Sequence, residues 1–289
     1  MEATLGSLAS AGPGELSVRT EAVAGARREW VRCATSWKGR LVLLGFLVAA
    51  AAPGIFRALH REAGSARTLA IGDQARALVK LYDLGVARNL YPCPASLVLS
   101  TVLLLYGLPL VMLLLAHDVF APDVPSPFDG PAAAPGSGAG RVVGAVAGRW
   151  AFFGCGALIL YAVVGAVEAV AGGPSTSTAV VLGWGASLFV SACLIAAAYT
   201  ALCALVSASF PNRWWTFGVG FASLVGLGLL HAVLHARAPL WARPLPGALD
   251  GLLLSNRVAL RLEGTIFAGL WCAVGLAGAV WALARRRRR

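Results

Sequence analysis

Three side chains could carry chemistry inside the apolar stretches of this sequence. Glu168 is the only carboxylate within a predicted span, where a charge costs roughly 2.5–3.5 kcal/mol, so it should face protein or water. Such a residue can line a pathway or a gate, but Glu168 lies near the outer end of its span and could also serve a structural or interfacial role. His231 and His235 are four residues apart on one helical face, a spacing that can hold a metal, yet no third ligand is evident nearby.

Several catalytic signatures are missing from the sequence. Neither Lys38 nor Lys80 belongs to a glycine-rich phosphate-binding motif, so we expect no ATP site in this chain. The six cysteines show no C-x-x-C spacing, and most lie in apolar runs, which favours buried thiols over a metal site or disulfides. We therefore predict no catalytic residues, no metal and no cofactor. An intramembrane enzyme that depends on Glu168, His231 or His235 is the less favoured alternative.

The composition indicates that lipid covers much of the protein. The chain is 58% hydrophobic and 13% charged, whereas a soluble domain carries roughly 25% charged residues. The net charge of +11 flanks apolar runs and is not interleaved with base-stacking aromatics, so we predict no nucleic-acid binding. The sequence thus predicts an all-α integral membrane protein in the inner (cytoplasmic) membrane of the cell.

Six apolar runs are long enough to cross the hydrocarbon core as helices. The predicted spans are 41–59, 96–116, 150–171, 179–206, 214–235 and 264–283. The last of them runs directly into five arginines, and positive residues next to a span are retained in the cytoplasm. Since six is even, we predict that both termini are cytoplasmic.

Residues 1–40 form a predicted cytoplasmic leader, and 41–289 form the transmembrane domain. The leader contains a predicted interfacial amphipathic helix at 15–38, with Arg28 and Arg32 on its polar side. Its apolar face consists of Val23, Ala26, Trp30, Cys33 and Trp37.

The connections between the spans differ in character. The first outer segment, about 60–95, predicts an amphipathic helix and then a break at Pro92 and Pro94. The second, about 236–263, is rich in proline and too short to span, which predicts a re-entrant or interfacial element before the last span. Residues 117–149 are a predicted flexible connection, because proline, glycine and alanine dominate 121–140.

One further pattern concerns helix packing. Gly144 and Gly148 form a G-x-x-x-G motif, which lets two helices approach closely. Because the chain has 34 glycines, chance matches are expected, and the motif alone is a weak signal.

Three local motifs, together with this layout, resemble the membrane subunit of type-2 ABC exporters, the ABC-2 type permeases. The second span leaves the membrane through an apolar run followed by Asp118, and Gly148-Arg149-Trp150 introduces the third span. The turn after the fourth span, Ser207 to Asn212, is similar to the Ser-x-x-Phe-x-Asn turn of that family. The resemblance extends from about Arg27 to the end of the chain.

The resemblance implies a permease subunit that forms the translocation pathway as a dimer, with itself or a similar permease, and is coupled to a separate ATP-binding cassette ATPase. Membrane lipid is the third expected partner. The candidate ATPase-docking residues are Asp118, Phe120, Arg141 and Arg149, and Glu168 is the candidate pathway residue. Arg141 and Arg149 could instead serve only as positive anchors on the cytoplasmic side.

The connection after the second span departs from the family pattern. Relatives place there a short helix with an acidic Gly-Thr-Leu-Arg-like motif that docks in the ATPase, whereas Pro125 to Gly140 lacks this motif. Either 117–124 and 141–149 supply the docking surface, or the coupling is altered. The alternative function is a non-transporting membrane scaffold or assembly factor with a degenerate permease fold.

Overall fold

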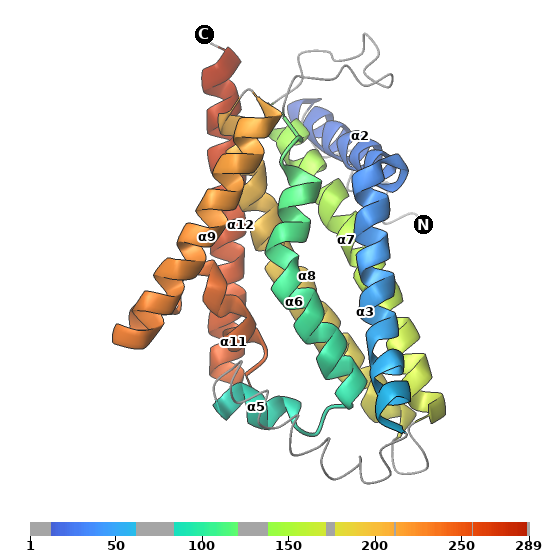
Figure 1. Ribbon diagram of the computed structural model, residues 1–289. Coiled ribbons are helices and arrows are strands. Elements are labelled where there is room, and N and C mark those ends of the chain that lie inside the picture. The colour runs from blue at the N-terminus through green and yellow to red at the C-terminus, as the bar shows by residue number, and fades with distance from the viewer. Residues whose placement is uncertain are drawn as a thin grey trace.

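The computed structural model describes residues 13–61, 84–120, 138–171, 177–210, 212–255 and 257–287, and these residues form helices and no strand. The helices are α2 (Pro13–Thr35), α3 (Trp37–Arg61), α5 (Leu84–Leu90), α6 (Ala95–Ala116), α7 (Gly138–Ala171), α8 (Thr178–Ser209), α9 (Arg213–Arg237), α10 (Pro239–Ala242), the 3-10 helix η1 (Pro246–Ala248), α11 (Leu249–Leu253) and α12 (Val258–Arg287). The long helices run side by side as a bundle, and α2 crosses one end of it (Figure 1).

Five of these helices, α6, α7, α8, α9 and α12, are long and apolar enough to cross a membrane. The pair α2 and α3, which is bent by 72° at Ser36, adds a sixth if the pair is counted as one span. The structure therefore confirms an all-helical protein with five to six helices that could span a membrane.

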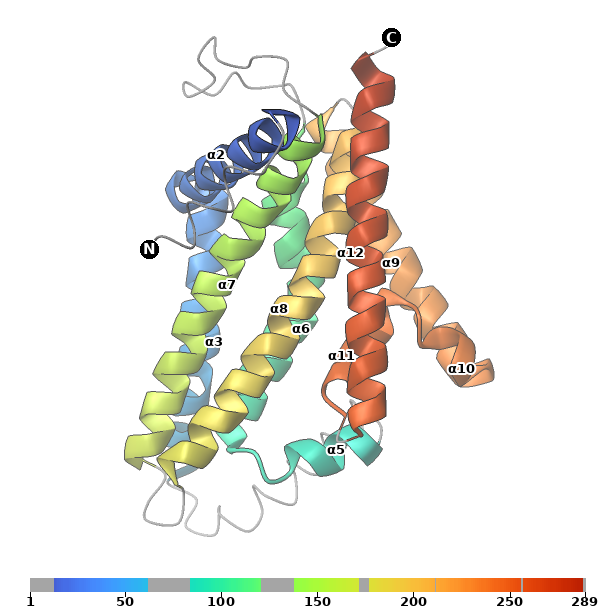
Figure 2. The same ribbon diagram turned by 180° about the vertical axis from the view of Figure 1, so that it is seen from behind.

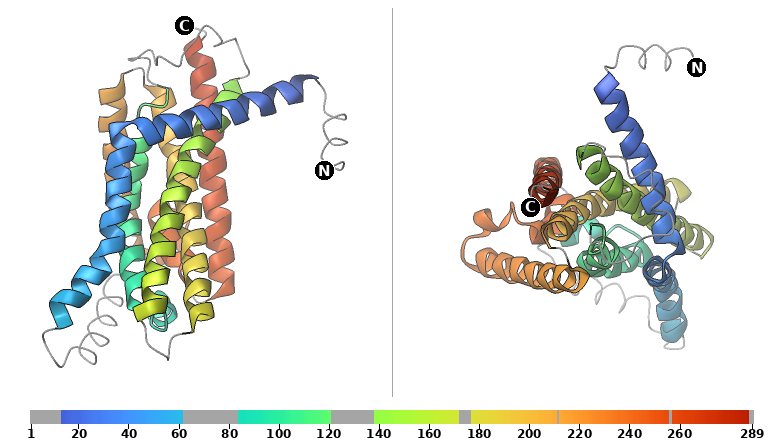
Figure 3. Two further views of the ribbon diagram at one scale, coloured as in Figure 1. Left: turned by 90° about the vertical axis from the view of Figure 1, so that its right-hand side faces the viewer. Right: turned by 90° about the horizontal axis from the view of Figure 1, so that it is seen from above.

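The bend at Ser36 separates a helix that runs across the bundle from one that runs along it (Figure 3). Ser36 Oγ accepts a hydrogen bond from the Gly39 amide at 3.1 Å, which satisfies one of the free donors at the start of α3. The C-terminal end of α12 lies at the same end of the bundle as α2 (Figure 1). We call this the basic end, because it carries the exposed arginines of α2 and those of the last turns of α12.

Helix α7 begins at Gly138, well before the predicted start of the third span at 150. The interval 138–149, which we expected to belong to a flexible connection, is therefore helical. It contains no proline, and its small residues pack against α2, so the helix continues out of the bundle core.

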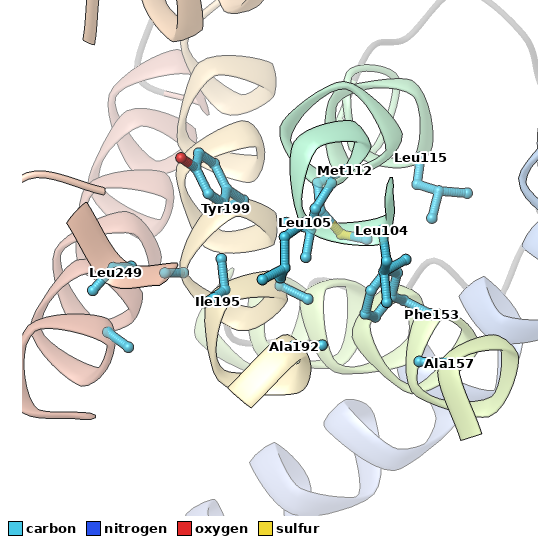
Figure 4. Packing of buried hydrophobic residues seen from close by; sticks show 14 of the residues in the cluster. Leu104, Leu105, Met112, Leu115, Phe153, Ala157, Ala192, Ile195, Tyr199 and Leu249 are labelled. Atoms are coloured by element: carbon cyan, nitrogen blue, oxygen red, sulfur yellow. The ribbon is translucent and has the colours of Figure 1, made fainter. Parts of the chain in front are cut away.

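Helix α8 is the centre of the bundle and packs against α6, α7 and α12 (Figure 2). Its buried face consists largely of small residues, among which alanine is the most frequent, and Leu105, Met112 and Phe153 from α6 and α7 pack around that face (Figure 4). A Cβ atom on Gly275 of α12 would lie 2.5 Å from the backbone of Ala201, so α8 and α12 touch backbone to backbone. Small residues at both positions allow this close contact.

The segment between α9 and α12 folds back into the bundle, where α11 packs against α8 and α12. Leu249, Leu252 and Leu253 of α11 are buried, and Trp271 Nε1 of α12 donates to the Pro244 carbonyl oxygen at 2.6 Å. Asn89 Nδ2 donates to the Leu254 carbonyl oxygen at 2.7 Å, which joins α5 to this element. The predicted helix in the first outer segment lies mostly outside the described residues.

Candidate functional site

Five charged or titratable side chains from four elements meet at the basic end, and we call them the charge cluster: Glu29, Lys38, His117, Asp118 and Arg149. Arg149 Nη2 lies 2.8 Å from Glu29 Oε2, and Arg149 Nη1 lies 3.2 Å from Asp118 Oδ1. Lys38 Nζ lies 2.5 Å from Asp118 Oδ2, so Asp118 bridges two cations. The cluster thereby connects α2, the start of α3, the end of α6 and the N-terminal part of α7.

Arg149 is the most deeply buried member of the charge cluster. Arg149 is 2% exposed, and its Nε also donates a hydrogen bond to Glu29 Oε2 at 3.1 Å. A buried cation is stable only where carboxylates and hydrogen bonds replace its hydration shell. Glu29 and Asp118 supply that replacement, so the positions of α2, α6 and α7 depend on one another through this side chain.

The charges of the cluster alter the titration of Asp118. Burial acts to raise the pKa of its carboxyl, but the nearby Arg149 and Lys38 charges outweigh burial and hold this pKa well below its ordinary value. Asp118 is therefore ionised throughout the physiological pH range. Its contribution to stability is present above its unfolded pKa of about 3.9 and is lost as pH falls through the lower folded value.

His117 is the member of the charge cluster that can change charge near neutral pH. Its Nε2 lies 3.1 Å from Lys38 Nζ, which can only donate, and its Nδ1 lies 3.1 Å and 3.0 Å from the carbonyl oxygens of Leu113 and Leu114. This arrangement fits a neutral ring protonated at Nδ1. Burial accordingly lowers the pKa of His117, assisted by the Lys38 charge and opposed by Asp118.

We predict that lowering the pH from about 7.5 to about 5.5 destabilises the wild-type protein more than a His117→Gln variant. The lowered folded pKa of His117 means that the unfolded chain binds more protons below about pH 6.5, so acid favours unfolding. Thermal unfolding in detergent at a series of pH values measures the difference between the two proteins. Identical pH dependence in both would contradict a neutral, buried His117.

A second feature fixes α2 on α7 next to the charge cluster. Gly140, Gly144 and Gly148 recur every four residues along α7, and we call them the glycine face. A Cβ atom on Gly144 would lie 2.5 Å from the Ala22 carbonyl oxygen, and one on Gly148 would collide with the Ala26 carbonyl oxygen. The two backbones are therefore in contact, and only glycine fits at Gly144 and Gly148.

The structure brings together two of the four residues predicted to dock an ATPase, Asp118 and Arg149. Phe120 is buried, and its amide donates to Ser207 Oγ at 3.1 Å. Arg141 is exposed on the first turns of α7. Arg149 and Phe120 thus present little surface to a partner, whereas the exposed Arg141 is accessible to one. The docking of an ATPase stays a prediction.

Glu168 lies near the other end of α7 and is 3% exposed. Ser96 Oγ of α6 donates a hydrogen bond to its Oε1. A second polar contact joins α6 to α7 in this half of the bundle, where the Thr101 and Tyr161 hydroxyls lie 3.0 Å apart. Glu168 therefore faces protein and not the surface, as a carboxylate in a span should. Its role in a pathway stays a prediction.

A comparison with models of known protein families and with curated protein sequences finds no match. The functional inference consequently depends on the charge cluster and the glycine face.

The histidine pair on α9 does not form a metal site with other described residues. The rings of His231 and His235 have centroids 5.6 Å apart. Across the described part of the chain, no group of three or more His, Cys, Asp and Glu side chains could hold a metal ion.

Three residues of the charge cluster, Glu29, Lys38 and His117, were not predicted as site residues. The signal of Glu29 and Lys38 in the sequence was weak, because each lies among other charged residues of the leader. The glycine face gave a clearer signal, since Gly140 extends the G-x-x-x-G motif by a further four residues. A glycine at every fourth position of one helix predicts a close helix contact more strongly than a single pair does.

Proposed function

We propose that this protein is the membrane subunit of an ATP-binding cassette exporter of the ABC-2 type. In this proposal six helices span the inner membrane, both termini are cytoplasmic, and the subunit pairs with itself or a similar permease. ATP hydrolysis belongs to a separate polypeptide. The observation that carries the proposal is the charge cluster, which joins the transverse helix α2 to both sides of the connection between α6 and α7.

The position of the charge cluster suits it to transmit movement. Asp118 lies two residues beyond the end of α6, and Arg149 lies in the part of α7 that follows the connection. A displacement of the connection by an ATPase would move both residues, and with them Glu29 on α2 and Lys38 on α3. ATP can shift the equilibrium between two such states only by its different affinity for each. The buried ion pairs make the four elements respond together.

We predict that Arg141→Glu weakens ATPase binding at least about tenfold, because reversing an exposed charge opposes a complementary surface. The full chain would be co-expressed with a candidate ATP-binding cassette ATPase from the same genome, and both the co-purified ratio and the ATP hydrolysis rate would be measured. Arg237→Glu, an equal charge reversal at the exposed end of α9, is the matched control. Equal effects of the two reversals would rule out Arg141 as a docking residue.

The scaffold alternative is favoured by one sequence feature, the absence of an ATPase-docking motif between Pro125 and Gly140. It makes the opposite prediction for co-expression. If the protein purifies as a stable species without any ATPase, and addition of the ATPase leaves its hydrolysis rate unchanged, the exporter proposal fails and the scaffold function stands.

A further inference from the structure

We propose that α2 and the first turns of α3 form a binding surface for anionic phospholipid headgroups at the basic end of the bundle. We call this surface the lipid corner, and its members are Val23, Arg27, Trp30, Trp37, Arg40, Leu41 and Leu44. The proposal requires only that α3 spans a bilayer, and it does not depend on an ATPase or on transport.

The bend between the two helices gives the lipid corner its geometry. Because α2 and α3 are inclined by 72°, a spanning α3 places α2 close to the plane of the membrane surface (Figure 3). The glycine face and the charge cluster hold α2 in this position from one side. The opposite side of α2 is left exposed where the headgroups of the lipid would lie.

Exposed aromatic and aliphatic side chains indicate how deeply the lipid corner would lie in the membrane. Val23 is 71% exposed, Trp30 is 39% exposed and Trp37 is 66% exposed. Tryptophan is enriched at the boundary between headgroups and hydrocarbon. Below Trp37, the residues Leu41 and Leu44 continue an exposed apolar stripe along α3, which suits contact with an acyl chain.

Two arginines supply the charge complementary to a phosphodiester. Arg27 and Arg40 are both exposed, and no carboxylate of the described residues pairs with either of them. They differ in this respect from Arg149 and Lys38, whose charges are already matched within the charge cluster. A guanidinium binds phosphate oxygens through two parallel hydrogen bonds, so exposed arginine beside tryptophan favours a lipid phosphate.

The chemistry selects anionic lipids over zwitterionic ones. Phosphatidylcholine carries its own quaternary ammonium, which competes with the guanidinium for the phosphate, whereas phosphatidylglycerol has a net negative charge. Basic residues close to an anionic membrane surface each contribute up to about fivefold in association. Two unpaired arginines at one corner should therefore produce a measurable preference.

The test uses the full-length protein in phosphatidylcholine bilayers that contain spin-labelled phosphatidylglycerol or spin-labelled phosphatidylcholine. Electron paramagnetic resonance gives the association constant of each lipid relative to the bulk. We expect the wild-type protein to prefer phosphatidylglycerol, and the R27Q/R40Q variant to lose at least about threefold of that preference. About 0.5 M salt should reduce the wild-type preference, because it screens surface charge.

The matched control removes two exposed arginines at the opposite end of the bundle. R237Q/R257Q changes the net charge equally and should leave the preference within error of the wild type. R27K/R40K keeps both charges and should retain most of the preference, which guards against a loss caused by misfolding. No preference in the wild type, or equal losses in R27Q/R40Q and R237Q/R257Q, would overturn the proposal.

Discussion

Replacing Arg149 with glutamine should destabilise the protein by about 3–5 kcal/mol. The guanidinium is 2% exposed and is the shared partner of Glu29 and Asp118. Its removal leaves the buried Glu29 carboxylate with only the more exposed Arg32, 3.6 Å away, and leaves Asp118 with Lys38 alone. A buried charge that loses its main partner costs far more than the net gain of the original ion pair. The midpoint of thermal or denaturant unfolding of the purified protein in detergent measures the effect.

Arg141→Gln is the matched control, because Arg141 lies two turns earlier on the same helix and is exposed. Its effect should remain within about 0.5 kcal/mol, as for other surface substitutions. A triple variant that also carries Glu29→Gln and Asp118→Asn should recover part of the lost stability, since it also removes the two carboxylates that lost their shared partner. Equal stability of the Arg149→Gln and Arg141→Gln variants would show that the charge cluster does not hold α2, α6 and α7 together.

The second large effect is expected from Gly148→Leu, which should separate α2 from α7. A Cβ atom at this position collides with the backbone of Ala26, so the rest of a leucine side chain cannot fit unless α2 moves away. Overpacking of this kind costs about 1–3 kcal/mol, and the movement would also break the nearby Arg149–Glu29 ion pair. Trypsin should then cut the intact protein faster after Arg27 and Arg28, both on α2.

Gly183→Leu is the control for this substitution. Gly183 lies on α8 with open space around its Cβ position, so the same change of residue meets no backbone there. It should leave both the unfolding midpoint and the rate of tryptic cleavage in α2 near their wild-type values. Unchanged cleavage in the Gly148→Leu variant would mean that the glycine face is not what holds α2 in place.

The long helices could be predicted because local sequence determines them. Each predicted span contains an uninterrupted apolar run, and prolines such as Pro94 mark where a helix can begin. The predicted third span begins at residue 150, where the strongly apolar residues begin, whereas α7 already begins at Gly138. The interval 138–149 carries Arg141 and Arg149, yet nothing in its backbone chemistry ends a helix.

The face of α2 shows what periodicity cannot distinguish. Val23, Ala26, Trp30, Cys33 and Trp37 were predicted to form one lipid-facing stripe. In the structure Ala26 packs against α7 and Cys33 is buried, while Val23 and Trp37 are largely exposed. Both protein and lipid are apolar neighbours, so a hydrophobic pattern does not say which of them a residue contacts.

The charge cluster could not be predicted from spacing at all. Glu29 and Arg149 are 120 positions apart in the sequence, and Lys38 and Asp118 are 80 apart. Local rules for helices concern residues three or four positions apart. The pairing arises only when α2 is laid across α7, and that crossing is fixed by the glycine face.

The length of α7 links bilayer thickness to the charge cluster. With 34 residues the helix is about 51 Å long, whereas the hydrocarbon layer measures about 30 Å. The portion from Arg149 to Ala171 alone extends about 33 Å, so the ion pairs would stand just at the edge of that layer. In a thicker bilayer with longer acyl chains, these charges would lie closer to the hydrocarbon. In a thinner bilayer they would be exposed to water. Membranes of different thickness should therefore tune how firmly the transverse helix is held.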